Sequence, residues 1–177
     1  MIMKKIFITL ALILSILPLY AQNEIKTSHF SWGMDIGSSI DMTSSEMTNI
    51  NFSGFVGYKN NYFRALGVGT EFDIMTSNSS RSIPVYALMR TSFIPGHHLL
   101  FGDFRVGASF NRIYDFKSQT GLFASVGLGG TLAKGKTFKS HLIIGYKFIS
   151  RSDITVEDKV EQFGDLHYAF VSLGISF

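Results

Sequence analysis

The sequence of 177 residues has no cysteine, and this absence excludes disulfide scaffolds and cysteine-ligated metal sites. Charged residues are scarce, since they make up 16% of the chain against about 25% in ordinary soluble domains. No apolar run reaches the roughly 18 residues that indicate a membrane-spanning helix. Hydrophobic residues nevertheless make up 46% of the chain, which is too much apolar surface for a disordered protein. The composition therefore fits either one hydrophobic soluble domain or a membrane protein without spanning helices.

The first 21 residues have the layout of a secretory signal peptide. Lys4 and Lys5 form a positive segment, residues 6–17 are almost entirely apolar, and Ala21 offers a small residue for cleavage. The apolar run is too short for a spanning helix. We therefore predict a cleaved signal peptide over residues 1–21 and one mature domain over residues 22–177.

Cleavage would also change the charge of the chain. The sequence pI is about 9.1, but removing two lysines lowers the formal net charge from +3 to +1. No stripe of Lys and Arg remains to follow a phosphate backbone, so nucleic-acid binding is not expected.

Eight segments of the predicted mature chain alternate between apolar and polar residues with period two, the pattern of strands that have two different faces. In the first segment Phe30, Trp32, Met34 and Ile36 alternate with smaller or polar residues. The remaining segments cover residues 52–58, 66–74, 83–93, 103–110, 121–129, 141–148 and 171–177. Most approach the 9–11 residues or so that a tilted strand needs to cross a bilayer.

The expected connections alternate in length. Short turn sequences lie at 59–61, 95–98 and 133–136, and longer polar connections lie at 38–49, 75–81, 111–119 and 150–165. This alternation is typical of outer-membrane barrels. It predicts an all-β, eight-stranded antiparallel up-and-down transmembrane β-barrel with both termini in the periplasm and four longer extracellular loops.

The distribution of charge separates a membrane barrel from a soluble, lipocalin-like barrel. On the apolar face the only formal charge is Arg64, which we place near the periplasmic end, where it can reach water. An unpaired charge inside a dry soluble core would cost several kcal/mol or more, so the charged face should line a polar lumen. We expect a luminal network of Asp35, Glu71, Asp73, Arg90, Asp103, Arg105, Lys139 and Lys147, in which four acids meet four bases.

Most of the strand glycines fall on this same face. The lumen of an eight-stranded barrel is only wide enough for side chains to fill it. The glycines should therefore make room for the larger luminal side chains of Phe55, Tyr86, Phe123, Tyr168 and Phe170.

Three segments make the chain resemble a known family: IPVYALMR (83–90), DFRVGASF (103–110) and the ending SLGISF (172–177). It resembles the small eight-stranded outer-membrane barrels of Gram-negative bacteria, of the OmpX, OmpA transmembrane-domain and opacity-like kind. The resemblance implies a monomer in the outer membrane, surrounded by lipid and lipopolysaccharide. It also implies that Leu173, Ile175 and Phe177 form the signal that the barrel-assembly machinery reads.

The sequence contains no phosphate-binding glycine loop, HExxH or GxSxG motif. We expect no cofactor and no metal, and we interpret His97 and His98 as solvated turn residues. One enzymatic alternative stays open, a lipid-A acylase or deacylase that would use His167 with Ser150, Ser152 or Asp153. A narrow, low-conductance channel is a second alternative.

The main hypothesis is a non-enzymatic barrel with a filled lumen and a structural or surface-interaction role. The last loop is the candidate interaction site for an extracellular protein, because its strand-like residues would let a protruding edge pair with a partner strand. Its charged residues include Arg151, Asp153, Glu157, Asp158 and Glu161.

Overall fold

The structure is a computed structural model, and it describes residues 29–43, 48–76, 80–94, 99–112, 119–150, 154–156, 159–161 and 164–177. The predicted signal peptide, residues 1–21, lies outside these ranges. No helix within them is long and apolar enough to cross a membrane.

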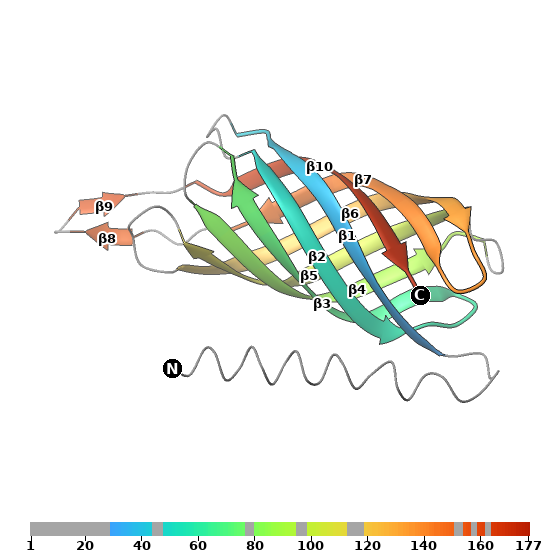
Figure 1. Ribbon diagram of the computed structural model, residues 1–177. Coiled ribbons are helices and arrows are strands. Elements are labelled where there is room, and N and C mark those ends of the chain that lie inside the picture. Colours follow the sequence, from blue (N-terminus) through green and yellow to red (C-terminus); the bar gives the residue numbers. More distant parts are fainter. Residues whose placement is uncertain are drawn as a thin grey trace, which may run out of the picture.

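Eight long antiparallel strands close into a barrel, as the alternating sequence predicted (Figure 1). The strands are β1 (Phe30–Asp41), β2 (Asn49–Tyr58), β3 (Phe63–Met75), β4 (Arg81–Ser92), β5 (Leu100–Arg112), β6 (Gln119–Lys134), β7 (Lys139–Ile149) and β10 (Leu166–Ser176). Each strand pairs with its neighbours along the chain, and β1 closes the barrel by pairing with β10.

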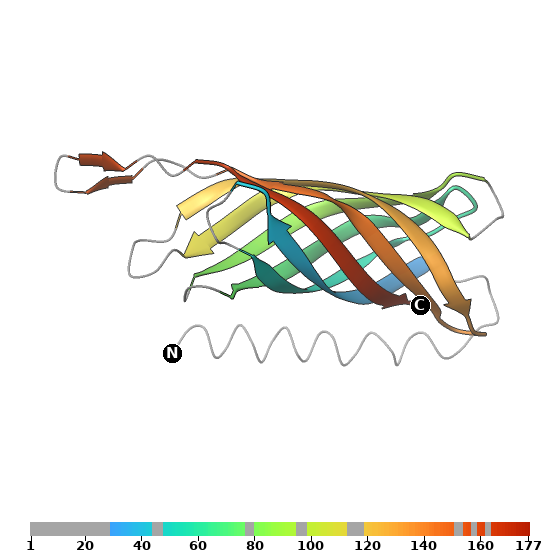
Figure 2. The ribbon, with the colours of Figure 1, turned by 90° about the horizontal axis from the view of Figure 1, so that it is seen from above.

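Two short strands, β8 (Ile154–Val156) and β9 (Lys159–Glu161), form a separate antiparallel hairpin. Both views show this hairpin beyond one end of the barrel (Figures 1 and 2). We call this the hairpin end. The opposite end, where Phe177 lies, is called the C-terminal end.

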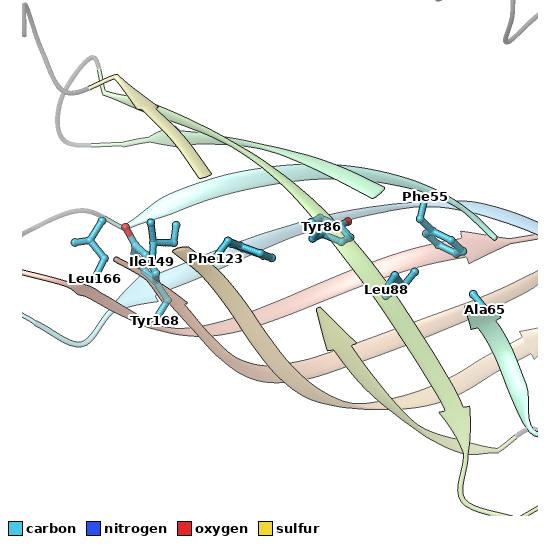
Figure 3. Close-up of a cluster of buried hydrophobic side chains, with 8 residues drawn as sticks. All are labelled: Phe55, Ala65, Tyr86, Leu88, Phe123, Ile149, Leu166 and Tyr168. Carbon is cyan, nitrogen blue, oxygen red and sulfur yellow. The ribbon is translucent and has the colours of Figure 1, made fainter. Parts of the chain in front are cut away.

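Successive side chains of each strand point alternately to the outer and the inner face of the barrel wall. The outer face is apolar, with side chains such as Met34, Val68, Val106 and Ile144 each more than half exposed. The inner face is polar and charged, and small aromatic and aliphatic clusters are packed within it. One cluster follows the lumen along much of the barrel (Figure 3) and consists of Phe55, Ala65, Tyr86, Leu88, Phe123, Ile149, Leu166 and Tyr168.

The predicted alternation of long and short connections is not observed. The strands extend into segments that the sequence assigned to loops; β1, for example, runs to Asp41. As a result, residues 93–99 between β4 and β5 form a connection as long as residues 42–48 between β1 and β2. The longest connection is 150–165, which carries the hairpin.

Candidate functional site

A network of buried ionic side chains crosses the middle of the barrel. Its members come from five strands, because inward positions on each strand recur at every second residue. They are Asp35 on β1, Glu71 and Asp73 on β3, Arg90 on β4, Asp103 and Arg105 on β5, and His141 and Lys147 on β7. Each of these side chains is almost completely inaccessible to solvent.

Arg105 is the central member. Its Nε lies 2.7 Å from Asp103 Oδ1, Nη1 lies 3.1 Å from Glu71 Oε2, and Nη2 lies 3.2 Å from Asp35 Oδ2. The planar guanidinium can donate several hydrogen bonds in fixed directions, which a lysine ammonium cannot do. Arg105 thus joins three carboxylates from three different strands.

Arg90 extends the network toward the C-terminal end. It donates to Asp35 Oδ2 and to Asp103 Oδ2, both at 2.5 Å. His141 Nε2 lies 2.8 Å from Asp35 Oδ1 and 3.2 Å from Arg90 Nη1. If His141 Nε2 carries a proton and donates it to Asp35, the same nitrogen cannot also accept a hydrogen bond from Arg90. The contact between His141 and Arg90 is then a packing contact.

Lys147 completes the network toward the hairpin end. Its Nζ lies 2.7 Å from both Glu71 Oε1 and Asp73 Oδ1. The four carboxyl groups of the network therefore face three permanent cations, Arg90, Arg105 and Lys147. Burial of this many charges is tolerable only when they are paired, and each of these seven charged side chains contacts at least one of opposite charge.

Aromatic rings cover the cations where carboxylates do not. Arg90 lies 4.3 Å above the centre of the Phe55 ring. The Arg105 guanidinium lies 5.3 Å from the centre of the Tyr86 ring, and Lys147 Nζ lies 5.3 Å from the centre of the Tyr168 ring. The three aromatic rings fill the lumen around the charges, and the face of each ring also attracts the cation above it.

Little space is left at the level of the network. The void lined by Asn51, Glu71, Arg105, Lys147 and neighbouring side chains is too small for a water molecule.

Lys139 and Arg64 are placed differently from the sequence prediction. Lys139 is not among the residues that the network's ion pairs join; it lies at the C-terminal end, beside a cavity. Arg64 was expected on the lipid face, which is wrong. A β-bulge between Phe63 and Ala65 breaks the alternation, so the Arg64 side chain reaches Thr131 Oγ1 at 2.5 Å and lies 4.2 Å above the Phe101 ring.

The other predicted site residues fall into two groups. Leu173 and Ile175 face outward on β10, and the Phe177 ring stacks on Trp32 with centroids 4.3 Å apart. Arg151, Asp153, Glu157 and Asp158 lie outside the described residues, as do His97 and His98, while Glu161 ends β9, opposite Ile154.

The histidine considered for lipid-A chemistry has a different partner. His167 Nδ1 is hydrogen-bonded to the Tyr146 hydroxyl, and its ring packs against Phe148. Among the described residues no hydrogen bond joins His167 to Ser150, and Ser152 and Asp153 lie outside the described ranges. The described ranges also contain no group of three or more acidic or histidine side chains suited to a metal.

The sequence pattern also places His141 in the lumen near Lys139 and predicts it as part of the polar network, which its contact with Asp35 confirms; the pattern missed Phe101. The sequence places His141 on the inner face because it lies two residues from Lys139 and six from Lys147, so that all three share the same period-two register. Phe101 gave no signal, because it precedes the first clear alternating residue of its strand.

Solved structures with this fold are outer-membrane proteins. The N-terminal β-barrel domain of Pseudomonas aeruginosa OprF matches with a TM-score of 0.54 and 11% identity, over 83% of this chain and 97% of that chain. Neisserial surface protein A (NspA) matches with a TM-score of 0.53 and 14% identity, over 84% and 96% of the two chains. No family model and no curated protein sequence matches.

At these identities the likeness establishes the fold, which is that of the small eight-stranded outer-membrane barrels. The wall of this barrel is apolar on its outside and charged on its inside, the arrangement that a bilayer requires. Fold and wall together place the barrel in an outer membrane.

Proposed function

We propose that this chain is a non-enzymatic outer-membrane barrel that is closed to diffusion and acts as a scaffold for a surface-interaction site at the hairpin end. The observation that carries the proposal is the buried ion-pair network, which joins five strands and fills the lumen. A barrel built in this way supports loops rigidly and does not conduct solutes freely.

Single-channel recording in planar bilayers tests the closed lumen. We expect no large, steady conductance from the wild-type barrel. In the double variant Asp73→Ser/Lys147→Ser one anion and one cation are removed together, so the formal charge is unchanged while space opens beside Glu71. This variant should conduct more than the wild type, and a wild-type barrel with steady porin-like conductance would overturn the proposal.

The β8–β9 hairpin supports the surface-interaction role. It stands apart from the barrel (Figure 2), and its two strands pair only with each other among the described residues. A two-stranded ribbon leaves backbone donors and acceptors along both edges, which suits pairing with a strand of another protein.

Photo-crosslinking on intact cells tests this role. A benzophenone amino acid at position 155 on the hairpin should capture a discrete extracellular protein, whereas the same probe at the exposed Thr43 should not. Deleting residues 153–161 should remove the product without reducing the heat-dependent gel shift of the folded barrel. Equal capture at both positions, or no capture at 155, would argue against the hairpin as the site.

Two further partners belong to this proposal. Lipid and lipopolysaccharide would contact the apolar wall, and the assembly machinery would read Leu173, Ile175 and Phe177 on the last strand. The exposure of Leu173 and Ile175 on the outer face supports that reading.

A further inference from the structure

A cavity of about 130 Å³ opens at the C-terminal end, above the ion-pair network. Its lining comes from the starts of β1, β3, β5 and β7, from the ends of β2, β4, β6 and β10, from the connections that follow β2 and β6, and from Phe177. Six of the lining residues are cationic: Lys59, Arg64, Arg90, Lys134, Lys136 and Lys139. We call this cavity the basic vestibule.

The charge of the vestibule is unbalanced. None of its lining residues that the structure describes is an Asp or Glu. Arg90, at its base, is already paired with Asp35 and Asp103. Lys139 instead lies within the repulsive field of Arg64, Lys134 and Lys59.

One cation of the vestibule is fixed by its contacts, and two others are partly desolvated. The Arg64 guanidinium is fixed by Thr131 Oγ1 and by the Phe101 ring beneath it. Lys59 and Lys139 are only partly exposed, and burial lowers the pKa of Lys59. Partly desolvated like charges that are held together raise the energy of the folded protein, and an anion placed among them would lower it.

From this geometry we infer that the basic vestibule is a binding site for a phosphate group. Arg64, Lys139 and Lys59 would supply charge-assisted hydrogen bonds, and the hydroxyl of Thr131 lies among them. The cavity volume of about 130 Å³ is sufficient for a phosphate group. The group would come either from free phosphate or from the headgroup of a phospholipid at the rim of the barrel.

The chain carries its own reporter for this site. Trp32 is its only tryptophan, and the Trp32 ring stacks on Phe177, which lines the vestibule. We therefore expect Trp32 fluorescence to change when the vestibule fills.

The experiment uses the full mature barrel in two settings. In zwitterionic detergent, inorganic phosphate is titrated against sodium chloride of matched ionic strength. In vesicles, phosphatidylcholine alone is compared with phosphatidylcholine containing phosphatidic acid, whose phosphate is uncovered. A saturable response to free phosphate indicates the soluble source, a response only with phosphatidic acid indicates the lipid source, and either one supports the site.

The triple variant Lys59→Gln/Arg64→Gln/Lys139→Gln should weaken binding by about tenfold or more, since charge-assisted contacts are lost. Lys139→Arg keeps the charge and should retain binding. Arg112→Gln, at the exposed hairpin end of β5, is the matched control and should bind like the wild type. Heat-dependent gel mobility confirms that each variant is folded.

Three results would overturn the inference: no saturable response to phosphate in either setting, an equal response to chloride, or unchanged binding by the folded triple variant. Conductance and hairpin crosslinking do not depend on the vestibule. A negative phosphate experiment therefore does not contradict the proposed function, and a negative result in the conductance or crosslinking experiment does not contradict the phosphate site.

Discussion

The inner and outer faces of the barrel wall differ most clearly along three successive residues of β5. Arg105 points inward, is 5% exposed and contacts three carboxylates. Val106 points outward and is 56% exposed. Gly107, on the inner side again, has no side chain and lies between Tyr86 on β4 and Phe123 on β6.

This comparison shows that adjacent residues on one strand are governed by opposite rules. On the outer face lipid replaces water, so apolar side chains carry no cost of exposure and a charge is unfavourable. On the inner face a charge is stable only through its partners, and volume is limited by the narrow lumen. Three substitutions at consecutive positions test these rules separately.

The largest effect is expected from Arg105→Met. The variant removes the cation that joins Asp35, Asp103 and Glu71, leaving buried carboxylates with fewer partners. Breaking a buried pair in this way typically costs about 3–5 kcal/mol. The free energy of unfolding in urea, followed by gel mobility in lipid vesicles, should fall by this amount.

The matched control is Arg112→Met, an exposed arginine on the same strand, which should shift the unfolding free energy by no more than about 0.5 kcal/mol. Equal effects at Arg105 and Arg112 would show that the luminal network does not stabilise the barrel.

The next effect is expected from Val106→Arg on the outer face. Arginine at the middle of the lipid-facing wall costs about 2–4 kcal/mol, and Val106 lies well inside β5, away from both ends of the strand. Val106→Leu is the control, because it keeps the apolar character and should be nearly neutral. The measurement is the same unfolding titration, and a barrel that tolerates arginine here without loss would not have this face in lipid.

The sequence predicted this division between the faces well, because an alternation with period two can be recognised from the local order of residues alone. It placed Asp35, Arg105 and Lys147 in the lumen without any knowledge of their partners. The ion pairs themselves join residues far apart in the chain, such as Lys147 and Asp73, so local spacing could not assign them.

Prediction from the sequence failed where the period is interrupted. A bulge in β3 shifts Arg64 to the lumen, and the bulge depends on how β3 registers with β4, which no local pattern encodes. Lys139 was expected in the luminal network of ion pairs, but it begins its strand and lies at the mouth of the barrel with Arg64. The basic vestibule was therefore not visible in the sequence.

The smallest of the three effects is expected from Gly107→Ala. A Cβ at this position would lie 2.0 Å from the Val85 carbonyl oxygen and 2.6 Å from Tyr86 Cα, both backbone atoms that cannot move alone. The rings of Tyr86 and Phe123, its two register partners, stack with centroids 5.4 Å apart, so this part of the lumen is already filled. Overpacking of this kind costs about 1–3 kcal/mol.

Gly54→Ala on β2 provides the control, since its Cβ would meet only the Gly33 carbonyl oxygen, at 3.9 Å. Alanine has a lower backbone entropy cost than glycine in a strand, so this variant should be neutral or slightly stabilising, by up to about 1 kcal/mol. If both alanine variants unfold at the same urea concentration, the close approach of β4 and β5 at Gly107 does not require glycine. If only Gly107→Ala is destabilised, the limited volume of the inner face acts on the backbone as well as on the charged side chains.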